Sequence, residues 1–169
     1  PDLSKCYGSP ISLTCAGNQT EAACQSQAGI DGLFATWLAS TTYSGCNGVL
    51  TTDPVTPAAP NACGGSTTVT WTYTSDCGVM TCMATFTVTP DVTAPTVTAP
   101  NTVDIECSTG LPVAATNIAG FLALPGATAS DNCTATADLL VSSVTGSLVG
   151  TDCNGTITRT YTITDKCGQ

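Results

Sequence analysis

An internal repeat restricts this chain to folds that contain two copies of one unit. The segment CGGSTTVTWTYTSDCG, from Cys63 to Gly78, aligns without a gap with CNGTITRTYTITDKCG, from Cys153 to Gly168. In both segments two cysteines stand the same distance apart, and threonine alternates with larger side chains between them. Self-similarity of this kind indicates a tandem array of structural units.

The match extends upstream and places a domain boundary. SGCNG around Cys46 aligns with DNCTA around Cys133, GIDGLFA with NIAGFLA, and ISLTCAG around Cys15 with VDIECSTG around Cys107. We therefore predict two domains, residues 1–90 and 91–169. The junction TPDVTAPTVTAP contains several prolines, which favour an extended, semi-rigid linker.

Alternation of residue types predicts half-buried β-strands in both repeats. Threonine lines most of the outward faces, where its hydroxyl keeps the surface hydrated and its branched side chain suits a strand. Arg159 is the one charged member of an inward set, so we expect it near a strand end or a domain junction. The inward sets are Val69, Trp71 and Tyr73; Cys82, Ala84, Phe86 and Val88; Val103, Ile105 and Cys107; and Ile157, Arg159, Tyr161 and Ile163.

Each repeat also contains one short segment with helical spacing of apolar residues. We expect these turns to cover one side of a β-sandwich rather than to form a ligand-binding aromatic patch. The residues are Ile30, Leu33, Phe34, Trp37 and Leu38 in the first repeat, and Ile118, Phe121 and Leu122 in the second.

The second repeat lacks the last strand of the first. After Cys77 the first repeat continues as TCMATFTVTP, whereas only Gly168 and Gln169 follow Cys167. A sandwich without this strand exposes a sheet edge and part of its core. Either the protein continues past Gln169 or a neighbouring chain supplies the strand, and we favour the first.

The charge balance excludes several classes of function. Three basic residues stand against 12 acidic ones, giving a net charge of -9 at pH 7. Nucleic-acid binding needs a basic stripe, and the same shortage disfavours anionic lipid. The chain has no histidine, which removes Ser-His-Asp and Cys-His catalysis and histidine-ligated metals. We expect no enzymatic activity, no cofactor and no membrane insertion, since no apolar run approaches a membrane helix in length.

Eleven cysteines without a C-x-x-C pair indicate disulfide bonds formed in an oxidising compartment. We therefore expect a secreted or cell-surface protein. Sequence alone does not fix the connectivity, but the repeat suggests Cys6–Cys82, Cys15–Cys77, Cys46–Cys63, Cys107–Cys167 and Cys133–Cys153. Cys24 is left over, as a buried thiol or an intermolecular bridge. An alternative pairs Cys15 with Cys24 and leaves Cys77 over.

Several other residues match the pattern of a functional site, but each match also has an ordinary structural explanation. Asn18, Asn132 and Asn154 match the N-glycosylation acceptor pattern, which arises easily in a threonine-rich chain. Trp37 and Tyr43 are the aromatic residues we would test for glycan binding. Weak calcium candidates are the loop acids Asp91, Asp131, Asp152 and Asp165. Turn-capping by these aspartates is the favoured interpretation, so we expect no metal site.

Together these motifs resemble the HYR-like and related bacterial immunoglobulin-like repeats of large secreted and cell-surface proteins. The resemblance rests on the linker TAPTVTAP, the D-N-C of Asp131 to Cys133, the D-x-C-G of Asp165 to Gly168, and the strand TCMATFTV. It implies an all-β fold: two tandem immunoglobulin-like β-sandwich domains, each with a short helical turn and stapled by disulfide bonds. Sandwich repeats host many roles, so the resemblance says little about function.

The features together lead us to expect a structural extracellular protein. We expect a repeat segment of a surface fibre, filament or stalk with head-to-tail assembly, whose partners are other copies of itself or further repeats of the same chain. The alternative is an adhesion or carbohydrate-binding module of a large surface protein, with a glycan as the partner.

Overall fold

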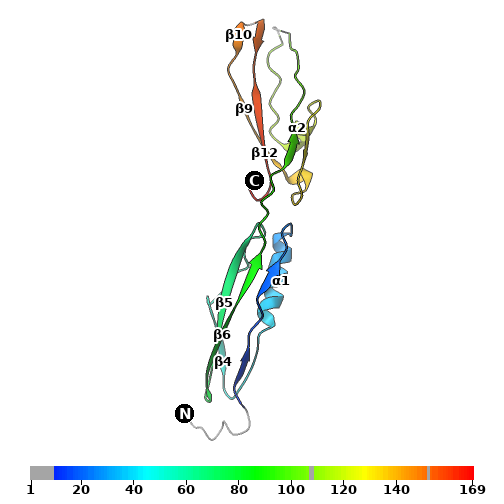
Figure 1. Cartoon of the computed structure of the whole chain (residues 1–169). Coiled ribbons are helices and arrows are strands. Elements are labelled where there is room, and N and C mark those ends of the chain that lie inside the picture. Colours follow the sequence, from blue (N-terminus) through cyan, green and yellow to red (C-terminus); the bar gives the residue numbers. More distant parts are fainter. Residues whose placement is uncertain (1–9, 107–108, 152) are drawn as a thin grey trace. The chain divides into compact units, whose positions relative to one another are not determined.

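The computed structural model describes residues 10–106, 109–151 and 153–169, and the fold is mostly β-structure (Figure 1). The chain divides into two compact units, Pro1–Asp91 and Val92–Gln169. Among the described residues, no helix is long and apolar enough to cross a membrane.

The first unit contains one four-stranded sheet, a strand pair and a helix. Its sheet has the order β2-β6-β5-β4, in which β6 pairs antiparallel with β5 and parallel with β2. The separate pair is antiparallel β1-β3. The elements are β1 (Ser12–Thr14), β2 (Gln19–Glu21), α1 (Gln27–Ala39), β3 (Thr42–Ser44), β4 (Val49–Asp53), β5 (Gly65–Ser75) and β6 (Gly78–Val88).

The predicted helix and the predicted strand faces of this unit are confirmed. Helix α1 begins after Ser26, whose Oγ accepts a hydrogen bond from the Gly29 amide at 3.1 Å and so caps the first turn. It packs against the inward faces of β5 and β6. There Trp37 contacts Trp71 and Phe86 in edge-to-face geometry, at 5.4 and 5.5 Å between ring centroids. Such pairs add about 0.5–1.5 kcal/mol beyond the burial of apolar area.

The second unit contains three antiparallel strand pairs and a short helix. The pairs are β7-β8, β9-β12 and β10-β11. Its core gathers small and medium side chains around Phe121, which is 1% exposed. The elements are β7 (Thr96–Thr98), α2 (Ile118–Leu122), β8 (Thr128–Ser130), a 3-10 turn (Thr136–Asp138), β9 (Leu140–Thr145), β10 (Val149–Thr151), β11 (Asn154–Thr156) and β12 (Arg159–Thr164).

The strand predicted around Val103 and Ile105 is wrong. Residues 101–106 form no strand, and Val103 and Ile105 are 61% and 44% exposed. Instead β7, earlier in the chain, pairs with β8 in the way that β1 pairs with β3. Arg159 is the first residue of β12, which confirms its expected place at a strand end.

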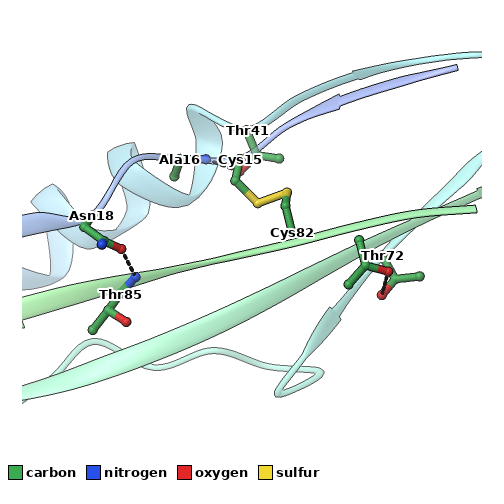
Figure 2. The surroundings of a disulfide bond; sticks show 8 residues. Cys15, Ala16, Asn18, Thr41, Thr72, Cys82 and Thr85 are labelled. Carbon is green, nitrogen blue, oxygen red and sulfur yellow. Dashed lines mark hydrogen bonds between the residues drawn. A yellow bond between two sulfur atoms is a disulfide. The ribbon is translucent and has the colours of Figure 1, made fainter. Parts of the chain in front are cut away.

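A disulfide joins Cys15 to Cys82, so the predicted bridges Cys6–Cys82 and Cys15–Cys77 are wrong. Figure 2 shows the bond linking the end of β1 to β6. Strand β1 contacts β6, and the Cα atoms of the two cysteines are 6.0 Å apart, within the usual range for a disulfide. Cys6 itself lies outside the described residues.

The predicted bridges Cys46–Cys63 and Cys133–Cys153 are also wrong, because Cys46 and Cys153 are thiols. The carbonyl of Cys46 accepts a hydrogen bond from the Asp76 amide, just after the end of β5, whereas Cys63 precedes that 11-residue strand. Cys153 is exposed between β10 and β11. In each predicted bridge, therefore, the two cysteines lie at different ends of the paired strands.

Cys24 is disulfide-bonded, which contradicts its predicted role as a leftover thiol or intermolecular bridge. The alternative bridge between Cys15 and Cys24 is excluded, because Cys15 is bonded to Cys82. The predicted bridge Cys107–Cys167 involves Cys107, which lies outside the described residues. The other disulfide-bonded cysteines are Cys63, Cys77, Cys133 and Cys167.

Candidate strand-acceptor site

Strand β12 of the second unit has a partner strand on one side only. It pairs with β9 along its whole length, from Arg159 opposite Thr145 to Thr164 opposite Leu140. Within the described part of the chain, no strand pairs with its other edge. The open edge expected from the sequence is therefore present.

The first unit shows what fills this edge in a complete repeat. There Leu50 of β4 lies opposite Tyr73 of β5, just as Val141 of β9 lies opposite Ile163 of β12. Because the repeat aligns Tyr73 with Ile163, β9 and β12 correspond to β4 and β5. The other edge of β5 is paired with β6 along its full length. The open edge of β12 is thus the position that β6 occupies in the first unit.

A groove of about 340 Å³ lies beside β12. It is bounded by β7, α2, β12 and the two residues after β7. Phe121 of α2 and Tyr161 of β12 meet edge to face in its wall, at 5.3 Å between centroids. The lining residues are Val97, Ala99, Pro100, Phe121, Arg159, Thr160 and Tyr161.

The corresponding space in the first unit is filled by the inward side chains of β6. Phe86 of β6 is fully buried and contacts Phe34 and Trp37 of α1, at 5.3 and 5.5 Å between centroids. Phe34 is 4% exposed, whereas Leu122, its counterpart in the repeat, is 37% exposed. The second unit therefore leaves apolar surface uncovered where β6 covers the first.

Among the described residues, the irregular segment 101–106 has no counterpart of β6 to pair with. In the first unit the short strand after β1 is β2, which lies at the edge of the sheet and pairs in parallel with β6. The strand pairing puts β7 in the place of β1, although the sequence alignment of Cys15 with Cys107 had put residues 104–106 there. Residues 101–106 therefore follow β7 as β2 follows β1, but no such strand is present for them to pair with in the described residues. One inserted strand would therefore find β12 on one side and this segment on the other.

This arrangement is chemically suited to bind an extended peptide. An open strand edge offers backbone N–H and C=O groups, and a neighbouring pocket accepts alternate side chains, which is how β-strand addition works. The open edge is predictable from the sequence, because the second repeat has no segment like TCMATFTVTP. The groove residues Val97, Ala99 and Pro100 are not predictable in this way, because their proximity to β12 depends on the position of β7.

The candidate glycosylation residues are all on the surface. Asn18, Asn132 and Asn154 are exposed. The side chain of Asn18 is already engaged, since its Oδ1 accepts a hydrogen bond from the Thr85 amide at 2.9 Å (Figure 2). Asn154 is the first residue of β11.

Of the two aromatic residues considered for glycan binding, one is buried and one is exposed. Trp37 is 3% exposed, and its indole N–H donates to the Gly17 carbonyl at 2.6 Å, so its ring is not available on the surface for a glycan. Its helical position facing the sheet places it in the core. Tyr43 is 50% exposed and packs against Tyr73 at 5.0 Å between centroids.

The calcium candidates occupy different environments. Asp91, the last residue of the first unit, is 5% exposed. Asp131 and Asp165 lie in two loops of the second unit, where Asp165 is 1% exposed. Asp152 lies outside the described residues.

Comparison of the chain with protein-family models and with curated proteins gave no match.

Proposed function

We propose that this chain is a structural segment of an extracellular fibre, filament or stalk with head-to-tail assembly, in which an added strand, from the continuing protein or from a neighbouring molecule, completes the second unit. The observation that carries the proposal is the open edge of β12 with its adjacent groove. The added strand runs antiparallel to β12, in the position that β6 has beside β5. Each unit is immunoglobulin-like and resembles the HYR-like repeats.

Where the added strand comes from another molecule, the geometry favours a row of molecules over a closed dimer. The acceptor is a groove and edge, and the donor is a strand, so the two surfaces that meet are different. Such a heterologous contact generates an open filament when its rotation does not close into a ring. Main-chain hydrogen bonds hold the strand, at a net of about 0.5–1.5 kcal/mol each, and a phenylalanine-sized side chain in the groove adds about 1.5–3 kcal/mol.

The composition supports a durable extracellular role. Only 9% of the residues are charged, and disulfide bonds reinforce both units. Disulfide bonds persist in oxidising environments such as the cell exterior. For the alternative function, a carbohydrate-binding module, Trp37 is buried, whereas the second aromatic candidate, Tyr43, is exposed.

Negative-stain electron microscopy of the unreduced chain tests this function. Val97→Glu places a charge in the groove, and we expect it to abolish regular filaments. Val144→Glu is the matched control, because Val144 is an exposed strand residue of the same unit that does not line the groove. Filaments that form equally well with both variants, or a native chain that stays monomeric at all concentrations, would rule out strand addition between molecules at this edge.

A further inference from the structure

The second unit contains a deeply buried carboxylate that is only partly satisfied by the protein. Asp165 is 1% exposed. Its Oδ1 accepts hydrogen bonds from the amides of Cys167 and Gln169, each at 2.8 Å. Its Oδ2 is buried and has no hydrogen-bond partner among the described residues. One oxygen of this carboxylate is therefore held by the loop, and the other is available to a ligand.

Asp131 repeats this arrangement on a second loop. Its Oδ2 accepts hydrogen bonds from the amides of Cys133 and Thr134, at 2.8 and 2.7 Å. Its Oδ1 is buried and, within the described part of the chain, lacks a hydrogen-bond partner. Both aspartates thus use one oxygen to fix the loop and keep the other unsatisfied.

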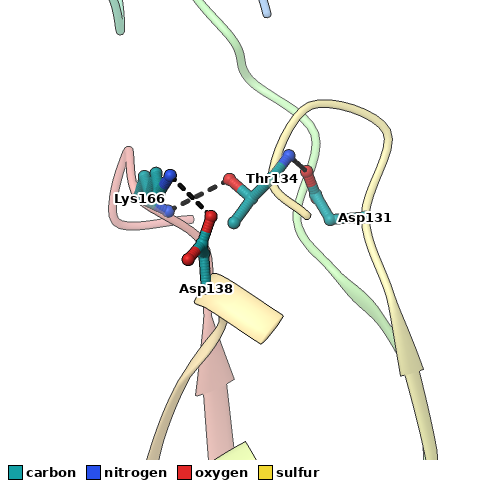
Figure 3. A network of polar contacts seen from close by, with 4 residues as sticks. All are labelled: Asp131, Thr134, Asp138 and Lys166. Atoms are coloured by element: carbon teal, nitrogen blue, oxygen red, sulfur yellow. Dashed lines mark hydrogen bonds and ion pairs between the residues drawn. The ribbon is translucent and has the colours of Figure 1, made fainter. Parts of the chain in front are cut away.

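The two loops are fastened to each other. The hydroxyl of Thr134, which is 4% exposed, accepts a hydrogen bond from the amide of Lys166 at 3.2 Å. Figure 3 shows this contact between the Asp131 loop and the loop that follows β12. The ammonium group of Lys166 pairs with exposed Asp138 at 2.8 Å instead of with either loop aspartate. The nearest basic side chain is therefore engaged elsewhere.

Buried carboxylate oxygens without a partner are costly. Removing a charged carboxylate from water is unfavourable unless hydrogen bonds or an opposite charge compensate. Backbone amides compensate one oxygen of each aspartate, and a bound cation would compensate the others.

The first unit provides an internal comparison. In the repeat Asp131 aligns with Ser44 and Asp165 with Ser75. Ser44 Oγ is hydrogen-bonded to Ser12 at 2.7 Å, and Ser75 Oγ accepts from the Cys77 amide at 3.2 Å and donates to the Gly78 carbonyl at 3.3 Å. Both aligned positions therefore carry neutral hydroxyls that make hydrogen bonds, and the Ser75 turn, in which Oγ accepts the amide two residues later, does not require a carboxylate.

We propose that Asp131 and Asp165 hold a calcium ion in the second unit. Carboxylate oxygens are the ligands that calcium prefers, and its flexible coordination lets backbone carbonyls and water complete the shell. Cys167 stands beside Asp165 but contributes no thiolate, because its sulfur is disulfide-bonded. Sites in extracellular modules bind calcium with dissociation constants of about 10⁻⁴–10⁻³ M, which is the range expected here. This site is independent of the proposed strand addition.

Calorimetric titration of the whole chain with calcium chloride tests the site. We expect the native chain to bind calcium, and Asp131→Asn or Asp165→Asn to weaken binding by about tenfold or more, because each removes a charged ligand. Asp138→Asn is the matched control: it removes an exposed acid close to the same loops, and we expect unchanged affinity. Equal affinity in native and Asp165→Asn chains would overturn the proposal.

Thermal unfolding keeps the proposal testable if a variant fails to fold. Calcium in excess should raise the melting temperature of the native chain by a few degrees over a chelator control, because the ion binds only the folded unit. A native chain that neither binds nor is stabilised at about 10 mM calcium, well above the expected dissociation constant, contradicts the inference.

Discussion

Replacing Cys15 and Cys82 together by alanine should destabilise the first unit strongly. The bond closes a loop with a sequence separation of 67 residues. In the chain-entropy model a loop of this length contributes about 4 kcal/mol, by restricting the unfolded chain. Cys24, Cys63 and Cys77 lie inside the loop and are also disulfide-bonded, and any crosslink formed within the loop lowers this contribution. We therefore expect a loss of roughly 2–4 kcal/mol.

Urea unfolding followed by tryptophan fluorescence measures this loss in the first unit alone. Both tryptophans of the chain, Trp37 and Trp71, are buried in its core. With a urea dependence of about 1–3 kcal/mol per molar, the midpoint should fall by about 1–2 M. Cys153→Ala, which removes an exposed thiol of the other unit, should leave it unchanged. A loss below about 1 kcal/mol would refute the loop-closure reasoning.

Two further predictions concern single side chains of the first unit. Gly48→Ala should destabilise the first unit by about 1–3 kcal/mol in thermal unfolding, because a Cβ at this position overlaps the Tyr73 phenol. Unchanged stability would contradict this reasoning and show that the ring moves freely. Side-chain hydrogen bonds, from Gln19 first and from Gln25 second, hold the pKa of Glu21 below its ordinary value of 4.5. The stability that these bonds give the folded state is therefore present above pH 4.5 and is lost as the pH falls through the lowered pKa. Titration by NMR should find this pKa below 4.5, and Glu21→Gln should remove the pH dependence.

The sequence predicted those parts of the fold that depend on local pattern. Alternation placed Trp71 and Phe86 on the inward faces of β5 and β6, and both are buried. Helical spacing placed Phe34 and Trp37 on the covered face of α1. These residues follow a period set by the backbone, so their direction can be read without knowing their partners.

The features that depend on distant partners were not predictable in the same way. The disulfide between Cys15 and Cys82 requires β1 to lie over β6, which repeat alignment does not reveal. Val103 and Ile105 alternate like a strand, but a strand forms only where another edge accepts its backbone hydrogen bonds. Asp165 matched an ordinary turn-capping residue, and only its burial and its unsatisfied oxygen distinguish it.

A cryo-electron microscopy map of the assembled native chain tests strand addition most directly. The account predicts density for an additional strand, antiparallel to β12 on the edge away from β9, with an apolar side chain in the groove beside Phe121 and Tyr161. That strand should be traceable to the continuing protein or to a neighbouring molecule. A fibre in which the β12 edge stays open while molecules meet elsewhere would contradict the account.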